Sequence, residues 1–219
     1  MKQYAVVGLG RFGSSIATTL YSMGHDVLVI DKDEEKIQTI SDFVTHAIQA
    51  DATDETILKA VGIRNFDVVA VTIGSDIQAS ILVTLLCKEQ GVDYVVTKAQ
   101  NELHAKVLYK VGADKVILPE HDMGLRVAHN LVSSNVLDYI ELDPNYGVVE
   151  IEVIPKWIGR TLKQLDLRVK YGVNVMAIKH GEDINISPGG DDMIDRGDIL
   201  VVIGENEDIA RIEKESQES

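Results

Sequence analysis

Three glycines near the start of the chain have the spacing of a phosphate-binding turn. Gly8, Gly10 and Gly13 follow the apolar run "YAVV" and precede a segment with helical spacing. In a strand–loop–helix turn, the first glycine permits the bend, the second lets the backbone approach a phosphate, and the third lets the helix pack against the sheet. The N–H groups at the helix start would face that anion. The pattern predicts a nucleotide site.

An acid at the end of the next apolar run supports the same interpretation. Asp31 ends "VLVID", 18 residues after Gly13. A carboxylate at this point accepts hydrogen bonds from the ribose hydroxyls of an adenosine and repels a 2′-phosphate. The alternative is a helix-capping aspartate before "KDEEK".

Arg11 lies between the second and third glycines. At the start of a helix its guanidinium could reach phosphates beyond the α position; the alternative is a solvent-exposed arginine without a ligand. The third apolar run ends in "QADATD". Asp51, Ala52 and Thr53 would then lie at the adenine edge, although Thr53 or Asp54 could instead cap the next helix.

Residues for catalysis are missing from this pattern. A dehydrogenase needs a general acid or base in a cleft beside its cofactor. None of the histidines lies in a catalytic pattern, and no Cys, His and Asp residues have metal-ligand spacing. The histidines are at positions 25, 46, 104, 121, 129 and 180. We therefore expect a nucleotide-binding protein that is not an enzyme.

The elements that must position these residues alternate between strands and helices. Strands that are apolar throughout are typical of a parallel sheet covered on both faces. They are expected at 3–8, 26–31, 45–51, 67–73, 94–99 and 115–120. The fold class is thus α/β, a Rossmann-like doubly wound parallel sheet that reaches about Glu120. A further helix is expected over 123–140, "MGLRVAHNLVSSNVLDYI".

The pattern changes after the turn residues of "ELDPNYG" at 141–147. Shorter, partly alternating runs follow, which indicate a small α+β domain. We expect strands at 148–154, 172–179, 183–187 and 198–204, one short helix at 161–171, and a helical tail from Asn206. The predicted domains are 1–137, a nucleotide-binding domain that includes the helix after the last strand, and 138–219.

Composition narrows the function classes. Hydrophobic residues make up 45% of the 219 and charged residues 26%, an ordinary globular balance. The net charge of −14 would repel a phosphate backbone, so no nucleic-acid partner is expected. The part from 138 has 9 basic and 18 acidic residues, a net charge of −9. The lone Cys87 lies in an apolar run and is expected to be a structural thiol of a reducing compartment. With no secretory signal or membrane span evident, we expect a cytoplasmic protein.

Several segments together resemble one family. "YAVVGLGRFGSSIA", "VLVIDKDEEK", "ADATD", "VGIRNFDVVAVTIGSDIQASI", "TKAQNELHAKVLYKVGADKVILPEHDMG" and "GDILVVIGENEDIARIE" are similar to the cytosolic regulatory subunits of Ktr-type potassium-uptake systems. These are regulators of potassium conductance, with a nucleotide-binding domain followed by a small C-terminal domain. The resemblance covers essentially the whole chain, and "GADKVILPE" is far more specific than the glycine motif.

The resemblance implies a set of site residues. Gly8, Gly10, Arg11, Phe12 and Gly13 would hold phosphates, with Arg11 at the γ-phosphate. Asp31 would bind ribose, Asp51 and Ala52 would lie at the adenine, and Lys98 would face the phosphates. Lys32, Thr53 and Gly74 complete the nucleotide-binding set. Glu120 would lie near the nucleotide and could hold a cation between its carboxylate and phosphate oxygens; a capping carboxylate is the alternative.

The resemblance also implies ligands and partners. ATP would activate and ADP inactivate, whereas related Trk regulators use NAD(H). Homodimers, formed through the helix after the sixth strand, would build an octameric ring beneath an integral-membrane potassium-translocating subunit, on the inner face of the membrane. The C-terminal domain of this family can bind c-di-AMP; Arg168, Asn174 and Pro188 match that pattern loosely, and turn or helix-end roles explain them equally well. The alternatives are a small NAD-dependent oxidoreductase and a nucleotide sensor that acts on another protein.

Overall fold

The computed structural model describes residues 2–132, 136–143 and 145–217. Contacts divide the chain into two compact units, Met1–His121 and Asp122–Ser219. The helices are α1 (Arg11–Ser22), α2 (Glu34–Ile40), α3 (Glu55–Ala60), α4 (Ile77–Glu89), α5 (Glu102–Lys110), α6 (Pro119–Val132), α7 (Leu162–Leu165), α8 (Leu167–Tyr171) and α9 (Asn206–Gln217). Short 3-10 helices are η1 (Ser41–Phe43), η2 (Ile63–Asn65) and η3 (Pro155–Trp157).

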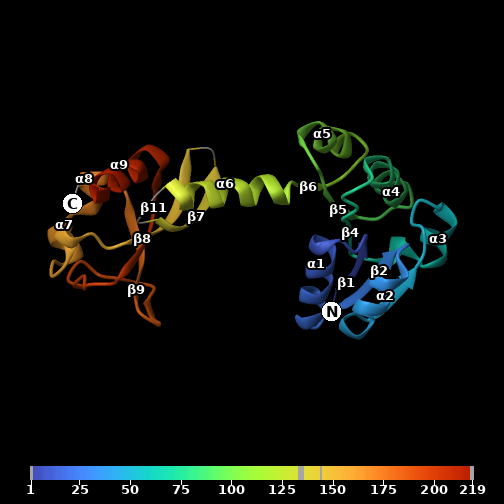
Figure 1. Ribbon diagram of the computed structural model, residues 1–219, viewed down its shortest axis with the longest axis horizontal. Coiled ribbons are helices and arrows are strands. Elements are labelled where there is room, and N and C mark those ends of the chain that lie inside the picture. Colours follow the sequence, from blue (N-terminus) through green and yellow to red (C-terminus); the bar gives the residue numbers. More distant parts are fainter. Residues whose placement is uncertain (1, 133–135, 144, 218–219) are drawn as a thin grey trace. The chain divides into compact units, whose positions relative to one another are not determined.

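The strands form one sheet in each unit (Figure 1). In the first unit they are β1 (Gln3–Val7), β2 (Asp26–Asp31), β3 (His46–Gln49), β4 (Val68–Val71), β5 (Tyr94–Lys98) and β6 (Lys115–Ile117). In the second they are β7 (Val136–Asp143), β8 (Tyr146–Glu152), β9 (Asn174–His180), β10 (Asp183–Asn185) and β11 (Ile199–Glu205).

The first sheet is parallel throughout, with the order β3-β2-β1-β4-β5-β6. Both of its faces are covered. On β1, Ala5 and Val7 pack into a core with α3 and α4, whereas Val6 packs on the other side with α1 and α2. This two-sided burial explains why the central residues of β1, β2 and β4 are apolar on both faces instead of alternating with polar ones. The predicted doubly wound sheet is confirmed.

Helices α2, α3, α4 and α5 each begin after a polar residue whose side chain accepts from their free N–H groups. Asp76 caps α4 by accepting from Ala79 N at 2.9 Å, and Asn101 caps α5 by accepting from His104 N at 2.9 Å. Such caps fix where each helix begins, and therefore where the preceding loop lies at the carboxyl edge of the sheet.

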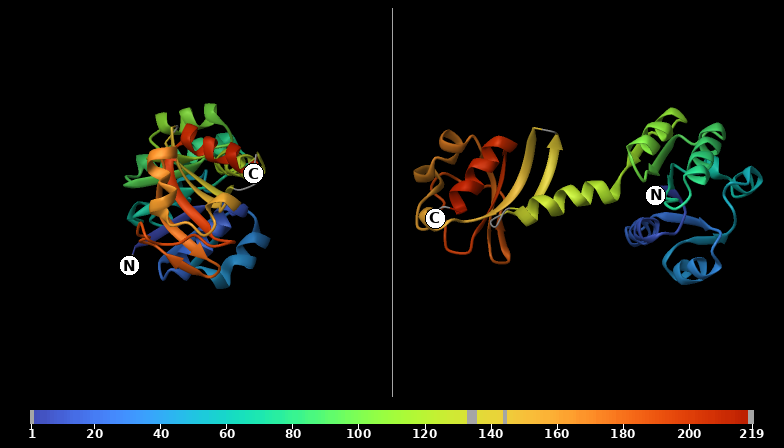
Figure 2. Two further views of the ribbon diagram at one scale, coloured as in Figure 1. Left: turned by 90° about the vertical axis from the view of Figure 1, so that its left-hand side faces the viewer. Right: turned by 45° about the horizontal axis from the view of Figure 1, so that its top comes forward.

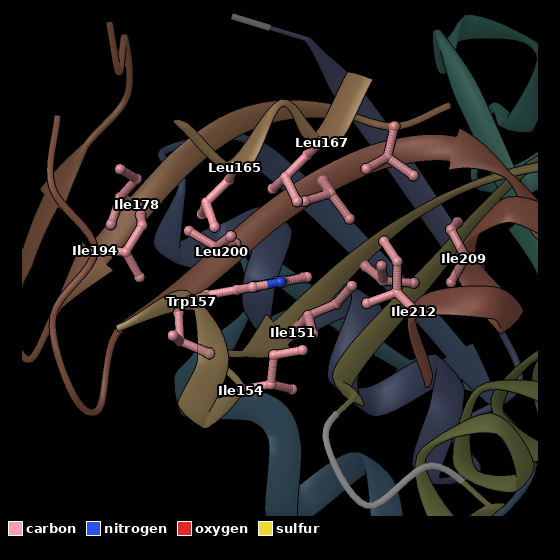
Figure 3. Packing of buried hydrophobic residues seen from close by; sticks show 14 of the residues in the cluster. Ile151, Ile154, Trp157, Leu165, Leu167, Ile178, Ile194, Leu200, Ile209 and Ile212 are labelled. Atoms are coloured by element: carbon pink, nitrogen blue, oxygen red, sulfur yellow. The ribbon is translucent and has the colours of Figure 1, made fainter. Parts of the chain in front are cut away.

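The second unit contains an antiparallel sheet in the order β10-β9-β11-β8-β7. Helix α9 lies over one face of this sheet and buries Ile209 and Ile212 against it (Figure 2). Trp157 is 2% exposed and lies among Ile151 and Leu200 in the same core (Figure 3). A small α+β domain, as the sequence predicted, is what the structure contains.

Two predicted elements were wrong in detail. The helix expected over 123–140 ends at Val132, and Val136–Asp143 is instead the edge strand β7, paired with β8. The single helix expected at 161–171 is divided at Asp166, whose φ of 49° is left-handed and ends the first turn. The predicted turn at 141–147 joins β7 to β8, although Pro144 lies outside the described residues.

The division between the units differs from the predicted domain boundary. It falls between His121 and Asp122, inside α6, rather than between 137 and 138. The later part of α6 contacts β7: Arg126 donates through Nε to Asp138 Oδ1 at 2.6 Å. The boundary at 137 stays a prediction. Within the described ranges, no helix combines the length and apolar character needed to cross a bilayer.

Candidate nucleotide site

The glycine loop connects β1 to α1 in a conformation that requires its glycines. Gly8 has a φ of 99°, and its N–H donates to Ile30 O at 2.8 Å. A side chain on Gly13 would overlap Gly8 O and Thr72 Oγ1. Thr72 Oγ1 itself donates to Gly8 O at 2.5 Å and so holds the loop against β4. The first and third glycines therefore have the roles expected from the sequence.

The second glycine, Gly10, has open space beside its Cα. Gly10 is the N-cap residue of α1 and gives it no side-chain cap, and nothing lies within 4 Å of the place where a Cβ would stand. The first N–H groups of α1 thus lack a side-chain acceptor from the cap, and the backbone is accessible there. An anion fits this position, because exposed N–H groups and the helix dipole both favour negative charge.

Asp31 binds the glycine loop rather than capping a helix. Its Oδ2 accepts from Leu9 N at 2.5 Å and its Oδ1 accepts from Asp33 N at 2.9 Å. The cap of α2 is Asp33, whose Oδ1 accepts from Glu35 N and Lys36 N. An ionised carboxylate has about four acceptor positions, so these two bonds do not use the full capacity of Asp31, whose Oδ2 also lies 3.9 Å from Lys36 Nζ. The capping role that was the alternative for Asp31 is filled by Asp33, which caps α2.

The segment expected at the adenine is folded into its own turn. Asp51 Oδ1 accepts from Thr53 N at 3.0 Å and from Thr53 Oγ1 at 2.7 Å, and these bonds lower the pKa of Asp51. Ala52 is 6% exposed and its methyl group belongs to the core, so only its backbone could contact a base. Asp54 caps α3 through Thr56 N, which leaves Thr53 free of that task. The side chain of Lys32 is exposed.

Three charged residues converge at the carboxyl edge of the sheet. Lys98, at the end of β5, forms an ion pair with Glu120 at 2.6 Å between Nζ and Oε1. The side chain of Lys98 is 14% exposed and that of Glu120 is 72% exposed. The hydrogen bond from Lys98 lowers the pKa of Glu120, and the charge of Arg11 contributes in the same direction. Arg11 therefore lies close enough to Glu120 to act on its charge.

The loop after β4 completes this edge. A Cβ on Gly74 would lie 3.5 Å from Lys98 Nζ, an ordinary van der Waals contact, so Gly74 lies beside this ammonium group. Arg11 is exposed, Phe12 is half-buried, and the Arg11 side chain forms no hydrogen bond or ion pair within the described part of the chain. The strands β1, β4 and β5 are neighbours in the sheet (Figure 1). Arg11, Gly74 and Lys98 follow or end these strands and therefore lie at the same edge.

Two residues beside this edge, Gln100 and His104, were not among the predicted site residues. Gln100 donates through Nε2 to Gly74 O, and Gln100 N donates to His104 Nδ1 at 3.3 Å. No motif marks either residue. The one available signal was position, because Gln100 follows the end of a strand whose carboxyl edge carries the site.

A cation site at Glu120 would need ligands from outside the protein. In the part of the chain that the structure describes, no group of three or more His, Cys, Asp or Glu residues could hold a metal ion. Glu120 supplies one carboxylate, so phosphate oxygens would have to supply further ligands. Mg²⁺ is commonly bound in this way, through one or two carboxylates and substrate phosphates.

The second unit places the three remaining candidates on exposed or half-exposed positions. Arg168 is exposed on α8, Asn174 is exposed at the start of β9, and Pro188 is half-buried in the loop after β10. Among the described residues, the side chains of Arg168 and Asn174 form no hydrogen bond or ion pair. The structure gives no contact that joins the three.

The sheet order, with a glycine loop at the carboxyl end of β1, defines a Rossmann-like α/β protein. The TrkA-N domain family matches residues 4–119 and the TrkA-C domain family matches residues 148–217. The chain is 50% identical over 213 residues to "Ktr system potassium uptake protein C" of Bacillus subtilis, covering 97% of this chain and 96% of that protein. It therefore belongs to the Ktr-type family of regulators of potassium conductance, with a TrkA-N domain followed by a TrkA-C domain.

Solved structures share this fold. The RCK domain of GsuK superposes with a TM-score of 0.70 at 15% identity, covering 97% of this chain and 47% of that one. A structure of GsuK bound to ADP superposes with a TM-score of 0.52 at 27% identity, covering 60% of this chain and 34% of that one. The chain thus spans less than half the length of these two structures.

Proposed function

We propose that this protein is the nucleotide-gated regulatory subunit of an integral-membrane potassium transporter, activated by ATP and inactivated by ADP. The observation that carries this proposal is the convergence of Arg11, Lys98 and Glu120 beside the glycine loop. Two cations, Arg11 at the start of α1 and Lys98 at the end of β5, suit a polyphosphate. Membership of the Ktr-type family and the ADP bound by a relative of known structure support a nucleotide as the ligand.

Arg11 distinguishes ATP from ADP in this proposal. The two nucleotides share every contact to adenine, ribose and the α-phosphate, so a switch needs a group that interacts with the γ-phosphate alone. A ligand shifts a conformational equilibrium only through its differential affinity for the two states. The side chain of Arg11 is free of hydrogen bonds and ion pairs within the described part of the chain, so it is available for a charge-assisted bond that ADP lacks.

The test is calorimetric titration of the purified protein with ATP, ADP and NADH. We expect Arg11→Ala to bind ADP nearly as the parent does and to lose about 1.5–3 kcal/mol of ATP affinity. Arg64→Ala is the matched control, because Arg64 is an exposed arginine on η2. Potassium flux in liposomes that hold the membrane subunit should rise with ATP for the parent and the control, but not for Arg11→Ala.

Other outcomes would favour the alternative functions. If Arg11→Ala still distinguishes ATP from ADP as well as the parent does, a residue other than Arg11 recognises the γ-phosphate. Turnover of a nicotinamide cofactor with a small substrate would indicate an oxidoreductase. Nucleotide binding without any effect on potassium flux, or copurification of an unrelated protein, would indicate a sensor with another target.

We also propose a cation between Glu120 and the phosphates of ATP. Glu120 already binds Lys98, so the cation would share the carboxylate or replace the ammonium group there. In Glu120→Gln, ATP affinity should no longer increase when Mg²⁺ is added, whereas Glu102→Gln, on an exposed residue of α5, should keep the increase. An unchanged response in Glu120→Gln would contradict the cation site.

The proposed assembly is a homodimer through α6, and dimers would form an octameric ring on the cytoplasmic face of the membrane subunit. Apolar side chains on α6 support an interface: Met123 is 54% exposed, Val127 is 46% exposed and Leu131 is 81% exposed. They recur at every fourth residue and thus form one stripe along the helix.

Finally, we propose c-di-AMP as a ligand of the second unit at Arg168, Asn174 and Pro188. The domain from 138 carries a net charge of −9, so a molecule with two phosphates needs a local cation there. The exposed Arg168 supplies one. Titration with c-di-AMP should show that Arg168→Ala abolishes binding and that Lys170→Ala, on the same helix, weakens it little. Full affinity in Arg168→Ala would contradict this position.

A further inference from the structure

A buried histidine lies directly behind the loop that follows β5. His104 is 3% exposed and occupies the first turns of α5. Its backbone N–H is satisfied by Asn101 Oδ1, which caps the helix. Its ring accepts a hydrogen bond at Nδ1 from Gln100 N, at 3.3 Å.

These contacts define which form of the ring is present. A backbone N–H can only donate, so Nδ1 must carry no proton, and the neutral ring has its proton on Nε2. Burial lowers the pKa of His104 and so favours this neutral form. Nε2 is buried and has no hydrogen-bond partner among the described residues. A buried N–H without a partner costs free energy. Of the two ring nitrogens of His104, only Nδ1 therefore contributes a hydrogen bond to the fold.

Gln100, whose backbone N–H donates to His104, connects two loops. Gln100 is exposed, and its side-chain amide donates to Gly74 O in the loop after β4. The chain from His104 through Gln100 to Gly74 therefore joins the loop after β5 to the loop after β4. Without an acceptor at Nδ1, Gln100 N would lose this partner and its backbone would be less constrained.

The loop after β4 also touches the glycine loop. A Cβ on Gly8 would meet Ile73 N at 3.0 Å, and Gly74 lies beside Lys98 Nζ. A shift of Gly74 would therefore change the space around both the glycine loop and the ammonium group. In the proposed function, the glycine loop and this ammonium group bind the phosphates of the nucleotide.

We infer that His104 is a positioning residue for the nucleotide site, which acts through Gln100 to fix the loop that contains Gly74. Its role is that of a hydrogen-bond acceptor inside the fold, and it does not touch the ligand. The inference rests on the proposed nucleotide site for its effect on affinity, but the connection between the loops exists without a ligand.

The experiment compares four variants of the full chain by calorimetric titration with ADP: His104→Leu, His104→Asn, Gln100→Ala and the double variant His104→Leu/Gln100→Ala. Asparagine keeps an acceptor near the place of Nδ1, whereas leucine fills the space without one. His104→Leu and Gln100→Ala should each weaken ADP binding about threefold to tenfold, which is the net effect of one lost hydrogen bond. His104→Asn should bind nearly as the parent does.

The double variant tests whether the two residues act along one path. If His104 acts through Gln100, the double variant should bind ADP no more weakly than Gln100→Ala alone. Independent effects that multiply would overturn the inference, as would parental affinity in His104→Leu or equal loss in His104→Asn and His104→Leu. If His104→Leu does not fold, Gln100→Ala, on an exposed residue, and His104→Asn still decide the matter.

Hydrogen exchange in the nucleotide-free protein provides a second readout. Amides at residues 73–76 should exchange faster in His104→Leu and Gln100→Ala than in the parent and in His104→Asn, while amides of β1 and β4 keep the parental rate. Unchanged exchange at 73–76 would overturn the inference. If the parent itself fails to bind ADP, ATP or NADH, the proposed nucleotide site is wrong, and the exchange rates alone decide whether His104 fixes this loop.

Discussion

Asp31 holds the glycine loop in the structure. Its carboxylate accepts from Leu9 N in the glycine loop and from Asp33 N, just before the next helix. In the proposed function the same carboxylate also accepts hydrogen bonds from ribose. A change at Asp31 is therefore expected to act on loop and ligand together.

We predict that Asp31→Ala weakens ATP and ADP binding equally, by about 1.5–3 kcal/mol in calorimetry, because charged hydrogen bonds are lost. The matched control is Asp33→Ala, which removes the cap of α2. That variant should lose about 1 kcal/mol of unfolding free energy and keep its nucleotide affinity. Equal affinities in the two variants would contradict the ribose role of Asp31.

Cys87 provides a prediction at the same scale. It is fully buried on α4, and burial raises the pKa of its thiol to about 12. Since the thiolate is the reactive form, iodoacetamide at pH 8 should modify the folded protein roughly a thousandfold more slowly than the protein in guanidinium. Mass spectrometry after timed quenching measures both rates. Similar rates would show that the thiol is accessible.

Residue types predicted the turn at Gly8 and the close packing at Gly13 because each depends on one local property, the absence of a side chain. The ribose role of Asp31 stays a prediction. Gln100 and His104 could not be found in this way. Their contacts join loops that are far apart in the sequence, and no periodic pattern records such a contact.

At the scale of elements, the parallel sheet was predictable and the edge strand β7 was not. Strands buried on both faces have runs of consecutive apolar residues, and that signal is independent of their neighbours. The segment "VLDYI" at 136–140 can continue the spacing of the helix before it. It is a strand because it pairs with β8, a partner that local spacing does not reveal.

The pair of Arg126 and Asp138 connects α6 to β7 and has a pH dependence. The hydrogen bond from Arg126 lowers the pKa of Asp138 from its ordinary value of 3.8. A carboxyl whose folded pKa is lowered stabilises the fold fully above its unfolded pKa and loses that contribution as the pH falls through its folded pKa. The contribution of this pair should therefore be complete at neutral pH and decline below about pH 4.

The corresponding test compares urea unfolding of the parent and Asp138→Asn between pH 7 and pH 3. We expect the parent to be more stable at pH 7 and the difference to shrink below pH 4, because protonated Asp138 resembles asparagine. Asp42→Asn, at an exposed residue of η1, is the control and should follow the parent at every pH. A difference that stays constant to pH 3 would contradict the role of the pair.

At the scale of the whole molecule, the division between the two units falls inside α6. Glu120, in the first turn of the helix, forms an ion pair with Lys98 within the first unit. Arg126, farther along the helix, binds Asp138 within the second unit. The apolar stripe of Met123, Val127 and Leu131 lies on the same helix.

The final prediction concerns that stripe. Val127 is the central residue of the three and is 46% exposed, so a charge there would be buried if two copies pack along α6. A buried, unpaired charge opposes association strongly. We predict that Val127→Glu shifts the protein toward monomers in light scattering coupled to size-exclusion chromatography, while its far-UV circular dichroism stays parental. Met23→Glu is the control, since Met23 is 69% exposed on the first unit outside α6. An assembly state that is the same in all three proteins would mean that α6 is not the dimer interface.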